Sequence, residues 1–255
     1  MTELTSLEVF VDSSASWVLN GTQNATFPQL LHFACSFSFD TQVANFLSKT
    51  CALLELEVDS IPTLHTPSLP PLPWTSIPRL IQFIGSSQAA KAIVPGRPVE
   101  SIHLSSGDLT KSIVDSFAES TARIVVLGAT TGLLPVPLLE LLAQHLPHLV
   151  YLRIMTTYKF SEAPDVVCLF VVDLAIPFFT FPFQVFYENV AKALATLPEL
   201  TAFELSGMHW GSRKRSDDNE KRVWQSKPLS SEFSHDQEEG SPVDFNPSSN
   251  YFLAY

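Results

Sequence analysis

The chain has 255 residues, 45% of them hydrophobic and 16% charged, so it can bury a core and is not disordered as a whole. Its net charge of −11 argues against electrostatic capture of nucleic acid or acidic lipid, and its nine glycines are few for a nucleotide-binding enzyme. Three cysteines cannot build a disulfide framework and no secretory signal is visible, so we expect a cytoplasmic or nuclear protein.

One short phrase recurs along the chain: a large apolar residue, two variable residues and a second apolar residue. The first apolar residues are Leu7, Leu30, Leu53, Leu80, Val99, Ile124, Leu149 and Leu200. The second ones are Phe10, Phe33, Leu56, Phe83, Ile102, Leu127, Leu152 and Phe203. Successive phrases begin 19 to 27 residues apart, except for the last, which begins 51 residues after its predecessor. Most of these steps fall in or next to the range of leucine-rich repeats, in which each unit is a short strand and a helix.

The intervals between the phrases carry apolar stripes with helical spacing. We expect these helices to begin behind Asp40, Asp108 and Pro137. Their stripes are Val43, Phe46 and Leu47; Ile113, Val114 and Phe117; and Leu138, Leu141, Leu142 and Leu146. Because one strand–helix unit cannot bury both of its faces, the units must stack. We therefore predict an α/β fold, an irregular leucine-rich-repeat-like solenoid of parallel strands alternating with helices, over residues 1–210.

Two segments depart from the repeat in composition. Residues 62–78 hold six prolines and are predicted to form a stiff surface loop, in which Trp74 is the best single candidate for an exposed contact residue. From residue 211 the apolar phrase stops and charged residues become frequent, so residues 211–255 are predicted to be a disordered charged tail.

The long last interval contains an almost continuously apolar stretch, residues 166–187, which is long enough to cross a membrane. A membrane-tethered repeat protein is therefore one alternative, although Asp173 near the centre and Pro177 and Pro182 oppose a membrane helix.

Residues 167–184 fit another hypothesis, a retained intron. Val167-Cys168 can be encoded by a donor splice sequence, and residues 181–184 by a pyrimidine-rich acceptor. Excision keeps the reading frame and leaves a helix with Asp165 as its N-cap. The apolar stripe of that helix is Phe186, Val190, Ala193, Leu194 and Leu197. Sequencing the transcript across this point tests the hypothesis.

Three patterns that could carry chemistry are each better explained by structure. Residues 126–132 resemble a dinucleotide-binding turn but lack its third glycine and its acidic partner, which favours a loop between repeats. Ser87 lies in a weak nucleophile-elbow pattern, and Ser86 or Ser87 is better explained as a helix cap. His145 and His148 have a spacing seen in metal sites, yet no further ligand accompanies them. We therefore predict no catalytic, cofactor-binding or metal-binding residue, and a small NAD(P)-binding or hydrolase-like enzyme remains the weakest alternative.

The expected strands also predict which side chains face outward. Cys35 and Cys51 lie at or beside the strands and are predicted to be small core residues. Strand alternation predicts a contact surface formed by Glu55, Glu57, Glu100, His103, Arg153 and Glu204.

The repeat phrases at Leu146–Ile154 and Leu197–Leu205 resemble the repeat region of fungal F-box/leucine-rich-repeat proteins. Similar segments occur at Phe83–Ser86, Val94–Val99 and Phe203–Trp210, and the resemblance covers about residues 4–211. It implies a non-catalytic module that recruits the substrate of a ubiquitin ligase, while an F-box would dock on the Skp adaptor of the cullin complex. No F-box is visible in this sequence, so that partner is expected only if an F-box is restored. We expect a protein partner, no cofactor and no nucleic acid.

Overall fold

The computed structural model describes residues 3–22, 25–58, 72–156, 181–205, 208–214 and 222–228. Its strands are β1 (Ser6–Val9), β2 (His32–Cys35), β3 (Glu55–Val58), β4 (Gln82–Ser86), β5 (Ser101–Asp108), β6 (Val126–Thr131), β7 (Tyr151–Thr156), β8 (Ala202–Leu205), β9 (Met208–Lys214) and β10 (Arg222–Pro228). Its helices are the 3-10 helix η1 (Ala15–Thr22) and the α-helices α1 (Thr41–Leu47), α2 (Ser87–Ile93), α3 (Lys111–Phe117), α4 (Pro135–His145) and α6 (Phe181–Leu194).

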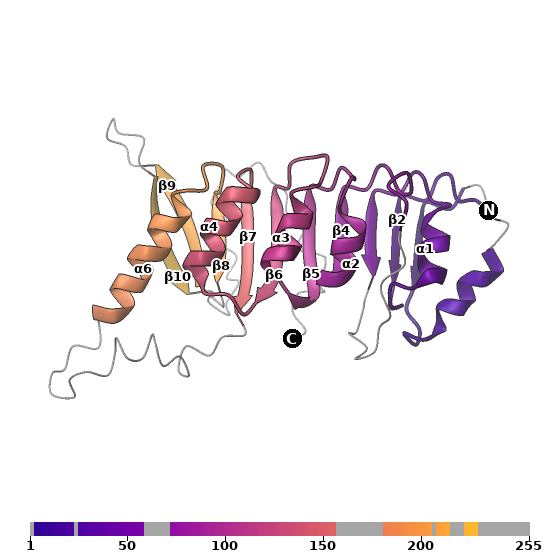
Figure 1. Ribbon diagram of the computed structural model, residues 1–255, viewed down its shortest axis with the longest axis horizontal. Coiled ribbons are helices and arrows are strands. Elements are labelled where there is room, and N and C mark those ends of the chain that lie inside the picture. Colours follow the sequence, from indigo (N-terminus) through magenta and orange to yellow (C-terminus); the bar gives the residue numbers. More distant parts are fainter. Residues whose placement is uncertain are drawn as a thin grey trace, which may run out of the picture.

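The strands form a single sheet in which strand order follows chain order from β1 to β10. Strands β1 to β8 are all parallel to their neighbours in this series. Strand β9 then pairs antiparallel with β8, and β10 pairs antiparallel with β9. The α-helices lie on one side of the sheet in Figure 1, α2, α3 and α4 following one another along it. The predicted α/β class is confirmed. The other side of the sheet carries no described helix. This is unusual, because parallel sheets usually have both faces covered.

The repeat phrase produces the apolar row that faces the helices. Its second apolar residues align across β2 to β8 in the order Phe33, Leu56, Phe83, Ile102, Leu127, Leu152 and Phe203. All of them are buried, and so are the first apolar residues from Leu30 to Leu200. The prediction is therefore confirmed from the second phrase onward.

The first phrase was predicted in the wrong register. Leu7, and not Phe10, aligns with Phe33, and the Phe10 side chain is 50% exposed beyond the end of β1. The error arises because Leu4 and Leu7 have the same spacing as Leu7 and Phe10, so the pattern alone fits two registers that differ by three residues.

The three predicted helix starts have different outcomes. The Asp40 carboxylate accepts hydrogen bonds from the backbone N–H groups of Gln42 and Val43, at 2.9 and 3.0 Å, which confirms it as the N-cap of α1. The prediction for Asp108 is wrong, because β5 extends through this residue and Thr110 is the N-cap of α3. Helix α4 begins at Pro135, two residues before the predicted Pro137, and a proline at the first turn needs no N–H partner.

The predicted tail contains two strands. Residues 211–214 belong to β9 and residues 222–228 form β10, so the prediction of disorder is wrong for these residues. Trp210 and Trp224 are the reason, because both side chains are buried and the Trp210 ring lies 6.4 Å from the ring of Phe203. Residues 229–255 lie outside the described part of the chain.

Helix α6 begins inside the segment that the intron hypothesis removes. Its first four residues are 181–184, and its buried side chains include Val190, Ala193 and Leu194, as the stripe predicts. Residues 167–180 and Asp165 lie outside the described residues, so splicing stays a prediction. Among the helices that the structure does describe, none has the combined length and hydrophobicity to span a bilayer.

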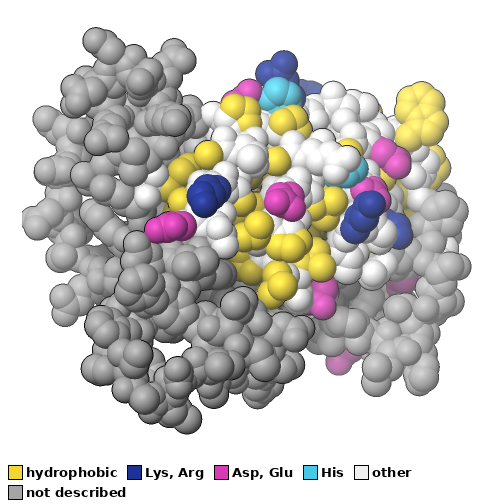
Figure 2. Space-filling view, turned by 60° about the vertical axis from the view of Figure 1, so that its left-hand side comes forward, with side chains coloured by type: hydrophobic (Ala, Val, Ile, Leu, Met, Phe, Trp, Pro, Cys, Tyr) yellow, Lys and Arg dark blue, Asp and Glu magenta, His cyan; other side chains and the backbone are white. Residues whose placement is uncertain are grey.

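The helix side of the molecule has an ordinary mixed surface. Figure 2 brings forward the end that carries α6, and shows hydrophobic side chains gathered around single charged ones. Leu133 and Leu134, in the loop that leads into α4, are 36% and 41% exposed. Apolar area broken by charges in this way is common on monomeric proteins and implies no particular ligand.

A glycine in β4 is required by the close packing between neighbouring strands. A Cβ atom at Gly85 would lie 2.7 Å from the carbonyl oxygen of Val58 and 2.8 Å from Cζ of Phe83. We expect Gly85→Ala to lower the free energy of unfolding by about 1–3 kcal/mol, because the backbone of β3 must shift. Urea denaturation measures this loss, and Gly21→Ala, where no atom lies within 4 Å, is the control. Equal stability of the two variants would contradict the packing argument.

Candidate binding face

The side of the sheet that carries no described helix is called the open face from here on. Its side chains form two rows across the strands, which alternate with the buried rows. One row is Ser6, His32, Glu55, Gln82, Ser101, Val126, Tyr151 and Ala202; the other is Glu8, Ala34, Glu57, Ile84, His103, Gly128, Arg153, Glu204 and His209. The predicted contact residues Glu55, Glu57, His103, Arg153 and Glu204 all belong to these rows, whereas Glu100 is exposed one residue before β5.

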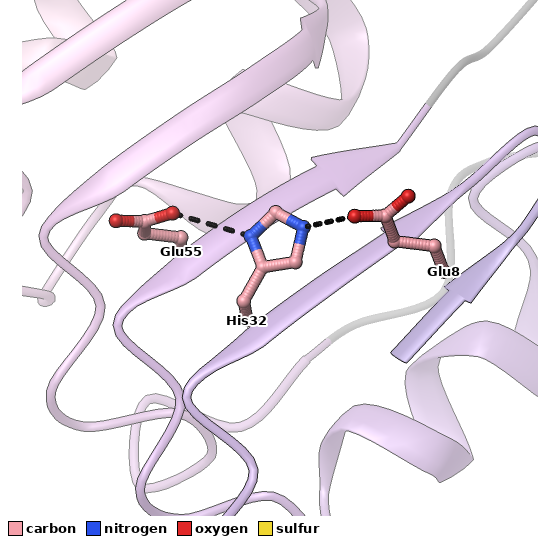
Figure 3. Close-up of polar contacts among 3 residues, drawn as sticks. All are labelled: Glu8, His32 and Glu55. Carbon is pink, nitrogen blue, oxygen red and sulfur yellow. Dashed lines mark hydrogen bonds and ion pairs between the residues drawn. The ribbon is translucent and has the colours of Figure 1, made fainter. Parts of the chain in front are cut away.

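The N-terminal part of the open face is acidic. The His32 ring lies between two glutamates: its Nδ1 is 3.2 Å from Glu55 Oε2 and its Nε2 is 3.7 Å from Glu8 Oε1 (Figure 3). These contacts join β1, β2 and β3 across the surface. Glu57 adds a third carboxylate on the same face of β3.

Toward the C-terminal end, five side chains form what we call the polar cluster. It consists of His103, Tyr151, Arg153, Glu204 and His209, on strands β5, β7, β8 and β9. The Arg153 Nε lies 3.4 Å from Glu204 Oε2, and the His209 Nδ1 lies 3.7 Å from Glu204 Oε1. Tyr151 also hydrogen-bonds to Glu204. Glu204 is therefore the centre of the cluster, and its side chain is only 16% exposed.

Burial fixes the protonation states of two members of the cluster. Desolvation, together with the positive charge of Arg153, lowers the pKa of His103 to about 4, so this imidazole is neutral at physiological pH. Burial, followed by the hydrogen bond to Glu204 and the charge of that carboxylate, raises the pKa of Tyr151, so the phenol keeps its proton. The cluster thus holds the Arg153–Glu204 ion pair beside two neutral side chains, those of His103 and Tyr151.

Gly128 makes room for the imidazole of His103. A Cβ atom at Gly128 would lie 2.8 Å from His103 Nδ1. The two residues are direct neighbours on β5 and β6, and Arg153 is the next residue in the same row. Because residues 126–131 form the strand β6, this segment is neither a dinucleotide-binding turn nor the loop that was predicted here.

The other chemical patterns have structural roles. The Ser86 hydroxyl accepts a hydrogen bond from the Ala89 N–H at 3.2 Å, which confirms the predicted helix cap, and Ser87 is buried in the first turn of α2. His145 lies 3.6 Å from a carboxylate oxygen of Asp115, and His148 lies 2.8 Å from one of Glu199. These histidines thus have different partners. Within the described ranges no group of three or more metal-ligating side chains comes together.

Two single-residue predictions have different outcomes. Cys35 is buried as predicted, but Cys51 is exposed, because it lies in the turn between α1 and β3 and not on a strand. Trp74 is 74% exposed, as expected of a contact residue, while its role in binding stays a prediction.

Sequence reasoning missed Tyr151 and His209. Tyr151 is the first residue of β7, on the same face as Arg153, so strand alternation could have identified it. His209 reaches the cluster only because β9 turns back against β8, which no repeat pattern signals.

Comparison with protein-family models and with curated protein sequences gives no match for this chain. Its function is therefore argued from the open face.

Proposed function

We propose that the chain is a non-catalytic protein-binding module, an irregular leucine-rich-repeat-like solenoid that recruits a protein through its open face. The observation that carries the proposal is the double row of residues across β1 to β9, most of them at least partly exposed, although Ala34 and Gly128 are buried, on a face that no described helix covers. An acidic end, apolar Ile84 at β4 and the polar cluster give this surface varied chemistry along its length. Such variation provides the electrostatic and shape complementarity that specific partners need.

The resemblance to F-box/leucine-rich-repeat proteins extends the proposal to a ubiquitin ligase adaptor, in which the open face recruits the substrate. This extension is tested by mixing the purified chain with the Skp adaptor, with and without the upstream gene region. Binding of the adaptor to the extended product supports the extension. Reproducible failure to bind leaves a protein-binding module outside the ligase.

The open face is tested by two charge-altering variants in the same strand–helix unit. Ile84 is partly exposed on the open face of β4, whereas Lys91 is exposed on α2 on the opposite side. We expect Ile84→Arg to weaken partner binding at least about tenfold, or about 1.4 kcal/mol, because it places a long charged side chain in the contact area. Lys91→Glu should leave binding unchanged.

The partners are first captured from lysate of the source cells, identified by quantitative mass spectrometry, and then titrated against each purified variant. A partner that is lost with Lys91→Glu and retained with Ile84→Arg would place the interface on the helix side and contradict the proposal.

A further inference from the structure

The two edge strands of the sheet, β10 and β1, differ in how well they are protected against pairing with a further strand. At the C-terminal end, β10 belongs to an antiparallel hairpin whose Trp210 and Trp224 are buried, and its last residues are Lys227 and Pro228. Proline donates no hydrogen bond and charged residues discourage further pairing, so this edge is protected against another strand. At the N-terminal end, β1 pairs only with β2 among the described strands.

Strand β1 exposes hydrogen-bonding groups along its outer edge. The inner edge of β1 is used by its neighbour. The Thr5 carbonyl accepts a hydrogen bond from the His32 N–H at 3.1 Å, and the Val9 carbonyl accepts one from the Ser36 N–H, directly after β2, at 3.2 Å. Because residues of a parallel strand turn alternately toward and away from a given neighbour, Ser6 and Glu8 direct their N–H and C=O groups away from β2. Both residues are exposed.

The hydrophobic core is also incompletely covered at this end. Leu4, Leu7 and Val9 pack against the core but are only partly buried, unlike the equivalent residues of the inner strands. Phe10 and Val11, directly after β1, are 50% and 49% exposed. In a stack of repeated units, a terminal unit with such a surface normally has a cap or a partner.

We propose that β1 pairs antiparallel with β1 of a second copy of this chain, with Leu7 on the two-fold axis. In this register Ser6 lies opposite Glu8 of the second copy, and the outward N–H and C=O groups of both residues meet in about four backbone hydrogen bonds. Leu7 then faces Leu7 on the core side, which covers the exposed end of the apolar row. Antiparallel pairs keep like faces together, so the open faces of both copies stay accessible.

Competing registers and occupants are less favourable. A two-fold axis at Glu8 would place two carboxylates directly opposite each other, whereas the axis at Leu7 places each Glu8 opposite a serine. Pairing of β1 with β10 of another copy would build an open filament and must use the edge that Lys227 and Pro228 protect. The proposal does not rest on the binding function of the open face.

The first test is the mass of the full chain in solution, measured by light scattering after size exclusion, up to about 100 µM. We expect a dimer for the natural sequence. Glu8→Pro should raise the dissociation constant at least about tenfold, because proline removes an outward N–H that β2 does not use. Glu8→Ala removes the same carboxylate but keeps the N–H, and should remain dimeric. A monomeric natural chain at all concentrations, or a Glu8→Pro variant with the dissociation constant of the natural chain, overturns the proposal.

The second test fixes the register and does not depend on the proline variant folding. In a chain that carries Cys51→Ser and Cys168→Ser, Leu7→Cys should form an intermolecular disulfide under mild oxidation. The two Cα atoms would be about 4.5 Å apart, within the roughly 4.4–6.8 Å range that a disulfide spans. Val9→Cys is the control, because its two copies would lie about 14 Å apart. Equal cross-linking of the two variants, or cross-linking of Val9→Cys alone, overturns the register.

Discussion

Replacing Arg97 by alanine is expected to lower the free energy of unfolding by about 3–4 kcal/mol, the largest effect of any single change considered for this protein. The Arg97 side chain is only 1% exposed, although its hydrogen-bond partners within the described part of the chain are all backbone carbonyls and include no carboxylate. Its guanidinium donates hydrogen bonds to backbone carbonyls on both sides of it. These are Ser76 at 3.0 Å, Pro73 at 2.7 Å, Leu72 at 3.2 Å, Pro95 at 3.3 Å and Ile93.

These bonds attach the end of the proline-rich segment to the end of α2. Within residues 72–76 the Ser76 N–H donates to the Pro73 carbonyl at 2.9 Å, and the guanidinium supplies further donors to the carbonyls of this segment. The carbonyl of Ile93 belongs to the last turn of α2, where a positive charge is favourable. Burial lowers the pKa of Arg97 to about 10, which is still well above neutral, so the residue stays charged. Alanine would leave buried carbonyls without a donor and create a cavity in place of the guanidinium.

Urea denaturation at neutral pH measures the loss, and two variants separate its causes. Arg79→Ala makes the same substitution at an exposed position near the start of β4 and should change stability by less than about 0.5 kcal/mol. Arg97→Lys keeps the charge but loses the planar arrangement of the guanidinium donors. Its free energy of unfolding should therefore lie between those of Arg97→Ala and the natural chain. If Arg97→Ala were as stable as Arg79→Ala, the guanidinium would not hold this segment.

The sequence was most informative where its apolar pattern repeats. From Leu30 to Phe203 the spacing of two apolar residues sufficed to place the strands, because burial on one face leaves few registers open. At the first unit this constraint is weak, since β1 has a neighbour on one side only, and the predicted register was wrong by three residues. Helices that begin with a capping side chain, such as Asp40, were located well.

The sequence was least informative where contacts join distant residues. Strands β9 and β10 have many charged and polar residues, and Trp210 and Trp224 are the buried ones among their side chains whose burial is described. No sequence pattern identified Arg97, because its partners Leu72, Pro73 and Ser76 lie 21 to 25 residues earlier in a segment without periodicity. On the open face, strand alternation predicted which side chains point outward. It did not predict the contact between Arg153 and Glu204, because the last two repeat phrases are separated by an unusually long interval.

The open face and the β1 edge suggest a division of roles along the sheet. Paired through β1, two copies would present their acidic ends next to each other at the centre and their polar clusters at the two far ends. A partner with two equivalent sites could then contact both clusters at once and gain affinity by avidity.

His103 is expected to make the protein less stable in acid. Its pKa is lowered from 6.5 to about 4 in the folded chain, chiefly by burial and secondly by Arg153. The unfolded chain therefore binds a proton more tightly than the folded one. Its contribution to stability is fully present above about pH 6.5 and is lost as the pH falls toward about 4. At pH 5 this loss amounts to about 2 kcal/mol.

The variant His103→Gln cannot take up this proton, so it isolates the contribution. Comparing urea unfolding at pH 7 and pH 5, we expect the natural chain to lose about 2 kcal/mol more than His103→Gln does, whatever the other carboxylates and histidines contribute. His148→Gln is the control, because this more exposed ring lies beside Glu199 and outside the polar cluster. An NMR titration of the His103 ring, with a midpoint near pH 4, identifies the group directly. A midpoint near 6.5, or equal acid sensitivity of the natural chain and His103→Gln, would mean that water reaches this side chain and that the polar cluster is solvated at its centre.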